Sequence, residues 1–220
     1  RFFILRIAHG IEPAAEESGS VEIVHHRGAN CLPVAGVRDA LAVGTITLCT
    51  GLGVGPNKIG NVYGIMKAYC TRVGSGPFPT ELFDETGNTI RDLGHEYGAV
   101  TGRERRCGWV DLVQLRYSIM VDGVTELIMM KSDVLDSFDT IKACVAYRLP
   151  DGTETRDFPY EIDNVEPIYK ELKGWKTDMT KFTSPDQFPQ EFKDYIKFLE
   201  DELETKIGII PIGPDREQTI

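Results

Sequence analysis

The stretch Glu126-Leu127-Ile128-Met129-Met130-Lys131-Ser132-Asp133 joins a short apolar run to a Lys-x-Asp sequence. Such a run, bounded by polar residues, is typical of a strand that is covered on both faces of a sheet. Together with the helical patterns elsewhere in the chain, it favours an α/β fold with a mixed sheet. Ligands of these folds usually bind beyond the carboxyl ends of the strands. Lys131 and Asp133 are therefore candidates for a ligand-binding edge.

A Lys-x-Asp sequence after a strand can recognise guanine. The Asp133 carboxylate would accept hydrogen bonds from the ring N–H and the exocyclic amine, while the Lys131 stem lies along the base. The same two residues can also form a surface salt bridge, and the pattern alone leaves that alternative open. Lys176-Thr177-Asp178 repeats the pattern in an unpatterned loop, and we assign it no role.

Two segments on the N-terminal side of this stretch have apolar residues at helical spacing. Residues 50–56 form a Gly-rich turn, and the spacing of Ile59, Val62 and Met66 after it predicts a helix over residues 57–70. A second helix is predicted over residues 109–120. Before these segments, residues 1–48 show no clear pattern apart from a possible short strand at Val21–Val24.

The C-terminal third alternates between strand and helix signals. Residues 141–149 alternate between apolar and polar, and Pro150-Asp151-Gly152 follows as a turn, which predicts a hairpin. Ser184-Pro185-Asp186-Gln187 has the residues of a helix start with a capping box, and an apolar stripe follows it through Leu203. Residues 207–212 are apolar and β-branched, so they predict a last strand.

The loop Gly98-Ala99-Val100-Thr101-Gly102-Arg103-Glu104-Arg105-Arg106 has three arginines within four residues. Guanidinium groups bind carboxylates and phosphates through paired hydrogen bonds, and glycine lets a backbone approach a ligand closely. The formal net charge of the chain is −10, so a basic loop stands out as a site for an anionic ligand. The alternative is a solvated loop that pairs with surface acids.

The composition narrows the class of protein. The chain has 34 acidic and 24 basic residues among 220, which disfavours binding to nucleic acid or to an anionic membrane. The five cysteines form no Cys-x-x-Cys pair and suggest a reducing compartment, so we expect a cytoplasmic protein. The longest apolar runs are too short to cross a bilayer.

Several common catalytic motifs are absent from the sequence. The glycines at 51, 53 and 55 do not match a phosphate-binding loop, and Pro56 removes a backbone donor there. The four histidines lack zinc-site spacing, and no serine or cysteine nucleophile motif occurs. We therefore assign no catalytic residue and no metal ligand to this chain.

Several of these pieces occur together, in order, in one known family. Residues 67–82, which read Lys-Ala-Tyr-Cys-Thr-Arg-Val-Gly-Ser-Gly-Pro-Phe-Pro-Thr-Glu-Leu, resemble the most recognisable stretch of adenylosuccinate synthetases. Residues 98–109 resemble their aspartate loop, residues 130–136 their guanine-specificity segment, and residues 213–216 their C-terminal turn. The resemblance covers residues 49–220 and implies the C-terminal portion of a mixed-sheet, P-loop-NTPase-like ligase fold with a small hairpin and helix subregion. Residues 1–48 are left as an atypical, unassigned segment.

The resemblance implies a GTP-dependent ligase that joins L-aspartate to IMP, giving adenylosuccinate for AMP biosynthesis. It implies that IMP is phosphorylated on O6 with the help of Mg²⁺, and that the aspartate amine then displaces this phosphate. Transferred residue by residue, it implies the following binding residues: for aspartate, Ala99, Val100, Thr101, Gly102, Arg103, Glu104 and Arg105; for IMP, Arg103; for GTP, Arg105, Lys131, Ser132, Asp133, Pro211, Ile212 and Gly213.

The sequence departs from the family pattern at three places. Val100 stands where many relatives have a threonine, and Pro211 stands where relatives usually have a serine. Residues 1–48 lack the segments with which relatives hold IMP. The phosphate-binding loop, the catalytic residues and the Mg²⁺ ligands of the family are expected in an N-terminal half outside this chain. We therefore expect this polypeptide to be inactive alone. The resemblance also implies a homodimer. The alternative is a non-catalytic fragment that binds a guanine nucleotide or a dicarboxylate.

Overall fold

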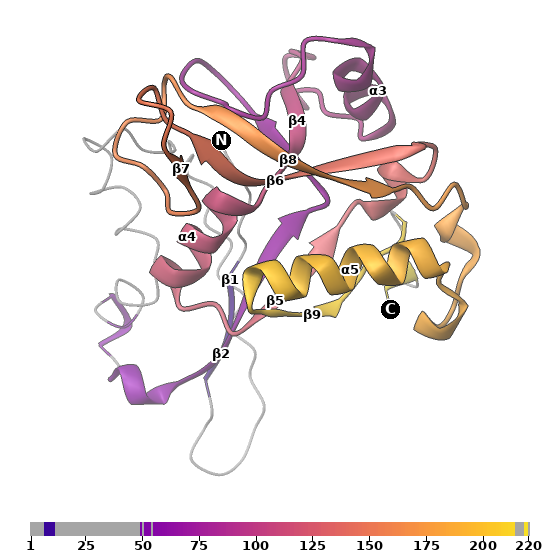
Figure 1. The fold of residues 1–220 in the computed structure, drawn as a ribbon. Helices are drawn as coiled ribbons and strands as arrows, with labels where there is room; N and C mark the ends of the chain where they lie inside the picture. The colour runs from indigo at the N-terminus through magenta and orange to yellow at the C-terminus, as the bar shows by residue number, and fades with distance from the viewer. Residues whose placement is uncertain (1–6, 12–48, 50, 54, 214–217, 220) are drawn as a thin grey trace.

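The computed structural model of the protein describes residues 7–11, 49, 51–53, 55–213, 218 and 219. Within these residues the chain forms two β-sheets that share one hydrophobic core, with helices packed against them (Figure 1). Parallel and antiparallel pairs occur in both sheets. This arrangement confirms the predicted mixed-sheet α/β class.

The first sheet has four strands in the order β1-β2-β5-β9. Its members are β1 (Ile7–Ile11), β2 (Ile59–Lys67), β5 (Glu126–Met130) and β9 (Lys206–Ile209). β1 pairs antiparallel with β2, whereas β5 lies parallel between β2 and β9. The strand predicted at Glu126–Met130 is therefore confirmed as an inner strand. β1 was not expected from the sequence.

The second sheet has five strands, ordered β3-β4-β6-β7 with β8 also paired to β6. Its members are β3 (Tyr69–Arg72), β4 (Arg106–Asp111), β6 (Thr140–Arg148), β7 (Glu154–Thr155) and β8 (Glu166–Lys173). The predicted hairpin after residues 141–149 is confirmed. Gly152 closes it at φ +86°, and its N–H donates to the Leu149 carbonyl at 2.8 Å.

The chain passes from the first sheet to the second at Ala68. This residue is fully buried between the end of β2 and the start of β3. Its N–H donates to the Met130 carbonyl at 2.9 Å, and its carbonyl accepts from the Tyr195 hydroxyl at 3.3 Å. The crossing point is thus fixed both to β5 and to a helix, so the ends of β2 and β5 are held together.

Helices and short 3-10 segments connect and cover the strands. They are η2 (Pro56–Lys58), α3 (Glu85–Leu93), α4 (Leu112–Asp122), η3 (Ser132–Leu135), η4 (Met179–Lys181), η5 (Pro185–Gln187) and α5 (Gln190–Leu203). The capping box at Ser184 is confirmed, although it begins η5 and α5 starts only at Gln190. α5 buries Phe192, Tyr195 and Leu199 and lies alongside β5 and β9 in Figure 1.

The helix predicted over residues 57–70 is wrong. η2 occupies its first residues, and β2 and β3 follow. Burial in β2 alternates through Val62, Gly64 and Met66, which is the period of a strand. Gly60 and Gly64 disfavour a helix, while the β-branched and aromatic residues between them favour a strand.

Two other element boundaries also differ from the predictions. The helix predicted over residues 109–120 begins only at Leu112, because Asp111 ends β4 and caps α4. The last strand ends at Ile209 rather than at residue 212. The possible strand at Val21–Val24 lies outside the described residues.

Two further observations concern the character of the chain. Cys49, Cys70, Cys107 and Cys144 are buried free thiols, while Cys31 lies outside the described residues. Among the helices that the structure describes, none has both the length and the apolar composition needed to cross a bilayer.

Candidate functional site

Two lysines emerge at the carboxyl ends of neighbouring parallel strands. Lys67 is the last residue of β2 and lies opposite Met130, the last residue of β5. Lys131 follows at once with φ +60°, a left-handed conformation that turns the chain out of the strand and into η3. Ligands of α/β folds bind at such strand ends, so this edge is the candidate site.

A single carboxylate gathers the cations of this edge. Glu96, in the segment after α3, is fully buried. Its Oε1 accepts from Lys67 Nζ at 2.6 Å and from Lys131 Nζ at 3.1 Å, and its Oε2 accepts from Arg105 Nη1 at 2.7 Å. The Tyr69 hydroxyl donates to Oε1 at 2.7 Å. These five residues, Lys67, Tyr69, Glu96, Arg105 and Lys131, are called the Glu96 cluster below.

Charges within the Glu96 cluster do not cancel. Burial alone would raise the pKa of Glu96, but attraction to Lys67, hydrogen bonds from Lys67 and Tyr69, and attraction to Lys131 outweigh it and hold that pKa at about 2. Burial lowers the pKa of Lys67, and the nearby charges of Lys131 and Arg105 lower it further. With all groups ionised, three cations surround one carboxylate, which leaves a surplus of positive charge suited to an anion.

The predicted aspartate loop is a narrow hairpin whose base rests on Glu96. The Arg105 N–H donates to the Glu96 carbonyl at 2.9 Å, and Tyr97 pairs with Glu104. The Gly98 N–H donates to the Arg103 carbonyl at 2.8 Å, and Gly102 closes the turn at φ +64°. One residue therefore holds Arg105 through both its backbone and its side chain.

The tip of this hairpin lies open to solvent. Residues 99–104 are all exposed, and Val100 is 97% exposed. Within the tip, the Thr101 hydroxyl accepts from the Arg103 N–H at 3.3 Å. The tip therefore presents its backbone and the Arg103 side chain outward, whereas Arg105 points back toward the sheet edge.

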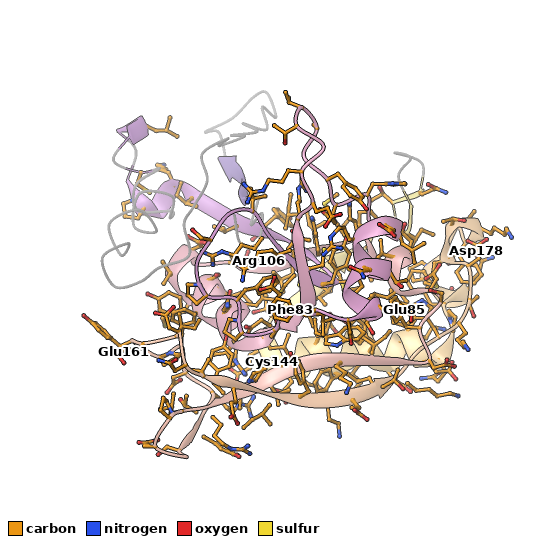
Figure 2. The ribbon with its side chains drawn as sticks, turned by 90° about the horizontal axis from the view of Figure 1, so that it is seen from above. Phe83, Glu85, Arg106, Cys144, Glu161 and Asp178 are labelled. Carbon is orange, nitrogen blue, oxygen red and sulfur yellow. The ribbon has the colours of Figure 1, made fainter. Side chains whose placement is uncertain are left out.

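The three arginines of the loop do not act together. Arg106, labelled in Figure 2, pairs with Glu81 and donates to the Gly76 carbonyl at 2.8 Å and to the Gly74 carbonyl at 3.1 Å. It fixes the loop after β3. The expectation of one joint arginine focus is thus corrected, because Arg106 serves the fold while Arg103 and Arg105 remain for the site.

The other residues predicted to bind GTP leave the first sheet at the same edge. Ser132 is fully buried, and its hydroxyl has no hydrogen-bond partner among the described residues. Burial raises the pKa of the half-buried Asp133 carboxyl. Because β9 runs parallel to β5, the segment Pro211–Gly213 beyond it exits beside Lys131–Asp133. Ile212 is fully buried, and its side chain belongs to the core.

The second Lys-x-Asp sequence lies elsewhere. Figure 2 shows Asp178 at one edge of the molecule, away from Arg106. The Asp178 carboxylate caps η4 and pairs with Lys181 at 2.9 Å. A local structural role explains this copy of the pattern.

A divalent metal does not fit the Glu96 cluster, because its one carboxylate is already bonded to three cations. Among the described residues, no group of three His, Cys, Asp or Glu side chains could hold a metal ion.

Comparison with known proteins gives the family. A family model described as adenylosuccinate synthetase matches residues 41–220. The chain belongs to the adenylosuccinate synthetase family. It is 75% identical over 173 residues to the adenylosuccinate synthetase of Phocaeicola vulgatus and 70% identical over 173 residues to that of Parabacteroides distasonis. Each alignment covers 78% of this chain and 41% of the relative, so the chain spans about two fifths of the length of these adenylosuccinate synthetases.

A solved structure supports the same conclusion. The fully ligated adenylosuccinate synthetase of Plasmodium falciparum superposes with a TM-score of 0.76 at 36% sequence identity. The match covers 80% of this chain and 43% of that chain. The described fold is therefore a portion of the adenylosuccinate synthetase fold.

Sequence reasoning placed Arg105 and Lys131 in one site but missed what joins them. Glu96, Lys67 and Tyr69 were not chosen, although residues 67 and 69 lie in the stretch that carried the resemblance. Glu96 sits between Gly94 and Gly98 without any periodic signal, and the two lysines that it bonds lie 29 and 35 residues away from it in sequence. No local pattern could have pointed to it.

Proposed function

We propose that this chain supplies the aspartate- and guanine-binding part of a GTP-dependent ligase that joins L-aspartate to IMP. Membership in the adenylosuccinate synthetase family supports the reaction class. The observation that carries the proposal is that Arg105 of the hairpin and Lys131 at the end of β5 share one buried carboxylate, Glu96. Residues predicted to bind the two co-substrates are thereby held side by side.

Roles follow from where each group lies. The exposed tip, Ala99 through Glu104, would receive the aspartate carboxylates through its N–H groups and Arg103, which would also contact IMP. Arg105 would reach the GTP phosphates. Asp133 would read guanine beside the Lys131 stem, together with Ser132, whose hydroxyl has no hydrogen-bond partner among the described residues. The segment of Pro211, Ile212 and Gly213 would lie beside the base.

The proposed reaction has two steps. In the first, the γ-phosphoryl group of GTP is transferred to O6 of IMP, and GDP is released. The aspartate amine then attacks C6, and inorganic phosphate leaves to give adenylosuccinate. Both steps develop negative charge on phosphoryl oxygens, which the positive surplus of the Glu96 cluster would stabilise. Mg²⁺ would neutralise charge on the nucleotide phosphates, and its ligands are expected in the part of the relatives that this chain does not span. Homodimer formation and a cytoplasmic location remain predictions.

A chimaera tests this proposal. Residues 41–220 replace the matching region of the Phocaeicola vulgatus adenylosuccinate synthetase, and adenylosuccinate formation is followed with GTP, IMP, aspartate and Mg²⁺. We expect turnover that requires GTP and is not supported by ATP, and none from the 220-residue chain alone. A folded chimaera without activity would contradict the ligase proposal. If that chimaera still bound GTP in preference to ATP, the non-catalytic binding alternative would stand.

A further inference from the structure

Glu96 is not among the residues predicted to bind a substrate, yet its carboxylate accepts hydrogen bonds from four side chains of the site. Its partners come from four segments: the end of β2, the start of β3, the base of the hairpin and the residue after β5. Lys131 Nζ also donates to the Gly94 carbonyl at 2.5 Å, so the segment around Glu96 is tied to β5 twice. The hairpin and the strand end cannot move independently while these bonds persist.

Two of the three cations bonded to Glu96, Arg105 and Lys131, are partly exposed. The Arg105 side chain is 30% exposed and that of Lys131 is 34% exposed, whereas that of Glu96 is 0% exposed. The anchor is therefore buried and the two cations keep faces that a ligand can reach, as a positioning group requires.

We infer that Glu96 is a positioning residue that holds Arg105 and Lys131 in a fixed mutual arrangement, and thereby couples the aspartate hairpin to guanine selection. The inference rests on the proposed function, since it assumes that these two cations face the aspartate and GTP sites. Loss of the carboxylate lets the three cations repel one another, so the hairpin base and the end of β5 separate. Both co-substrates then bind less well, and the base is read less strictly.

The chain offers a matched control. Glu81 also bonds an arginine at the base of the same hairpin, Arg106, but the structure gives it no bond to Lys131. Glu81→Gln removes one carboxylate charge beside the hairpin and leaves the link to β5 intact. Comparing the two variants therefore distinguishes a general loosening of the hairpin from loss of the coupling between the hairpin and the end of β5.

The test uses the chimaera carrying Glu96→Gln, Glu81→Gln, or the pair Lys67→Met and Glu96→Gln. The pair removes the buried cation that Glu96→Gln leaves without its carboxylate, so it stays folded if the single variant does not. We expect Glu96→Gln and the pair to raise KM for both aspartate and GTP at least tenfold and to reduce the GTP-over-ATP preference in kcat/KM at least tenfold. Glu81→Gln should keep that preference within about twofold.

Outcomes of this test separate the inference from the proposed function. An unchanged GTP preference in a folded Glu96 variant overturns the inference while the ligase function stands. A loss of preference in Glu81→Gln as large as in Glu96→Gln overturns it too, because a general loosening would then explain both. If the unsubstituted chimaera is inactive, calorimetric binding of GTP and ATP decides. If the unsubstituted chimaera prefers GTP and Glu96→Gln abolishes that preference, the inference is supported without the ligase function. If the unsubstituted chimaera binds GTP and ATP equally, the inference and the proposed function are both overturned.

Discussion

Two fully buried carboxylic acids of this chain, Glu96 and Asp111, have pKa values that are shifted in opposite directions. Glu96 lies beside the end of the first sheet and bonds Lys67, Lys131 and Arg105. These cations hold its pKa at about 2 even though burial favours the neutral form. The carboxylate thus stays ionised and its surroundings remain positive.

Asp111 ends β4 in the second sheet and has no cation bonded to it among the described contacts. It accepts from the N–H groups of Val113 at 3.1 Å and Gln114 at 3.2 Å, and from the Tyr147 hydroxyl. Burial raises its pKa to about 6 despite these hydrogen bonds. The side chain caps α4, and its bonding capacity is used within the fold.

The difference separates a functional carboxylate from a structural one. Asp111 completes backbone groups that a helix start leaves unpaired, so its hydrogen bonds serve the fold. Glu96 instead collects more positive charge than it can neutralise, from segments far apart in sequence. Both residues are buried carboxylic acids, and the surplus of cations around Glu96 marks the site.

Removing the Glu96 charge should give the largest effect on stability. Glu96→Gln leaves Lys67, whose side chain is only 15% exposed, beside two other cations without a counter-charge. Breaking such a buried pair costs about 4 kcal/mol in the free energy of unfolding. Urea denaturation of the chain at pH 7, followed by circular dichroism, measures it.

Adding Lys67→Met to Glu96→Gln sharpens this result. The second substitution removes the stranded cation, so it should recover about 2 kcal/mol of the loss. A further loss of stability from Lys67→Met in that background would show that packing of the lysine stem, and not its charge, carries the effect.

The two carboxylates should respond to pH in opposite directions, each by about 3 kcal/mol. The Glu96 pKa is depressed from 4.5 to about 2, so its contribution is complete above pH 4.5 and is lost as pH falls toward 2. The Asp111 pKa is raised from 3.8 to about 6, so its contribution is complete below pH 3.8 and is lost as pH rises through 6.

Variant subtraction measures these slopes. The stability difference between the unsubstituted chain and Glu96→Gln should shrink as the pH is lowered. As the pH rises from about 4 to about 6, the unsubstituted chain should lose stability relative to Asp111→Asn. Parallel curves for the two differences would mean that the carboxylates share one environment, contrary to the structure.

Asp111→Ala should cost less than the loss of Glu96 because it strands no charge. The variant loses the cap of α4 and the acceptor of the Tyr147 hydroxyl, for a total of about 2 kcal/mol at pH 7. Asp111→Asn keeps an acceptor for the cap and should cost under about 1 kcal/mol. Thermal denaturation compares the two, and an equal loss in both would show that the charge is what α4 requires.

The sequence predicted those parts of the fold whose signals are local. Residues 126–130 were recognisable because an inner parallel strand has an unbroken apolar run, here residues 127–130, and the hairpin after residue 149 because its turn needs Gly152. Residues 57–70 were misassigned, since Ile59, Val62 and Met66 fit helical spacing, whereas only Val62 and Met66 share the buried face of the strand. Contacts with β5 decide between the two, and these lie some 60 residues away.

The site divides in the same way. Arg105 and Lys131 were found because each belongs to a motif with its own chemistry. Glu96 was missed because its importance comes only from what the fold brings to it. A buried acid without periodicity looks the same in sequence whether it becomes Glu96 or Asp111.

The smallest expected effect on stability concerns the tip of the hairpin, in contrast to its base. Val100 is 97% exposed, so Val100→Thr should leave the midpoint of urea unfolding unchanged. The added hydroxyl can hydrogen-bond an aspartate carboxylate, and KM for aspartate in the chimaera should fall severalfold while KM for GTP stays constant. Met120→Thr, at an exposed position of α4, serves as the control and should alter neither KM. Because the tip meets the ligand and the base sets the geometry, a change in GTP preference from Val100→Thr would show that coupling reaches beyond Glu96 to the tip itself.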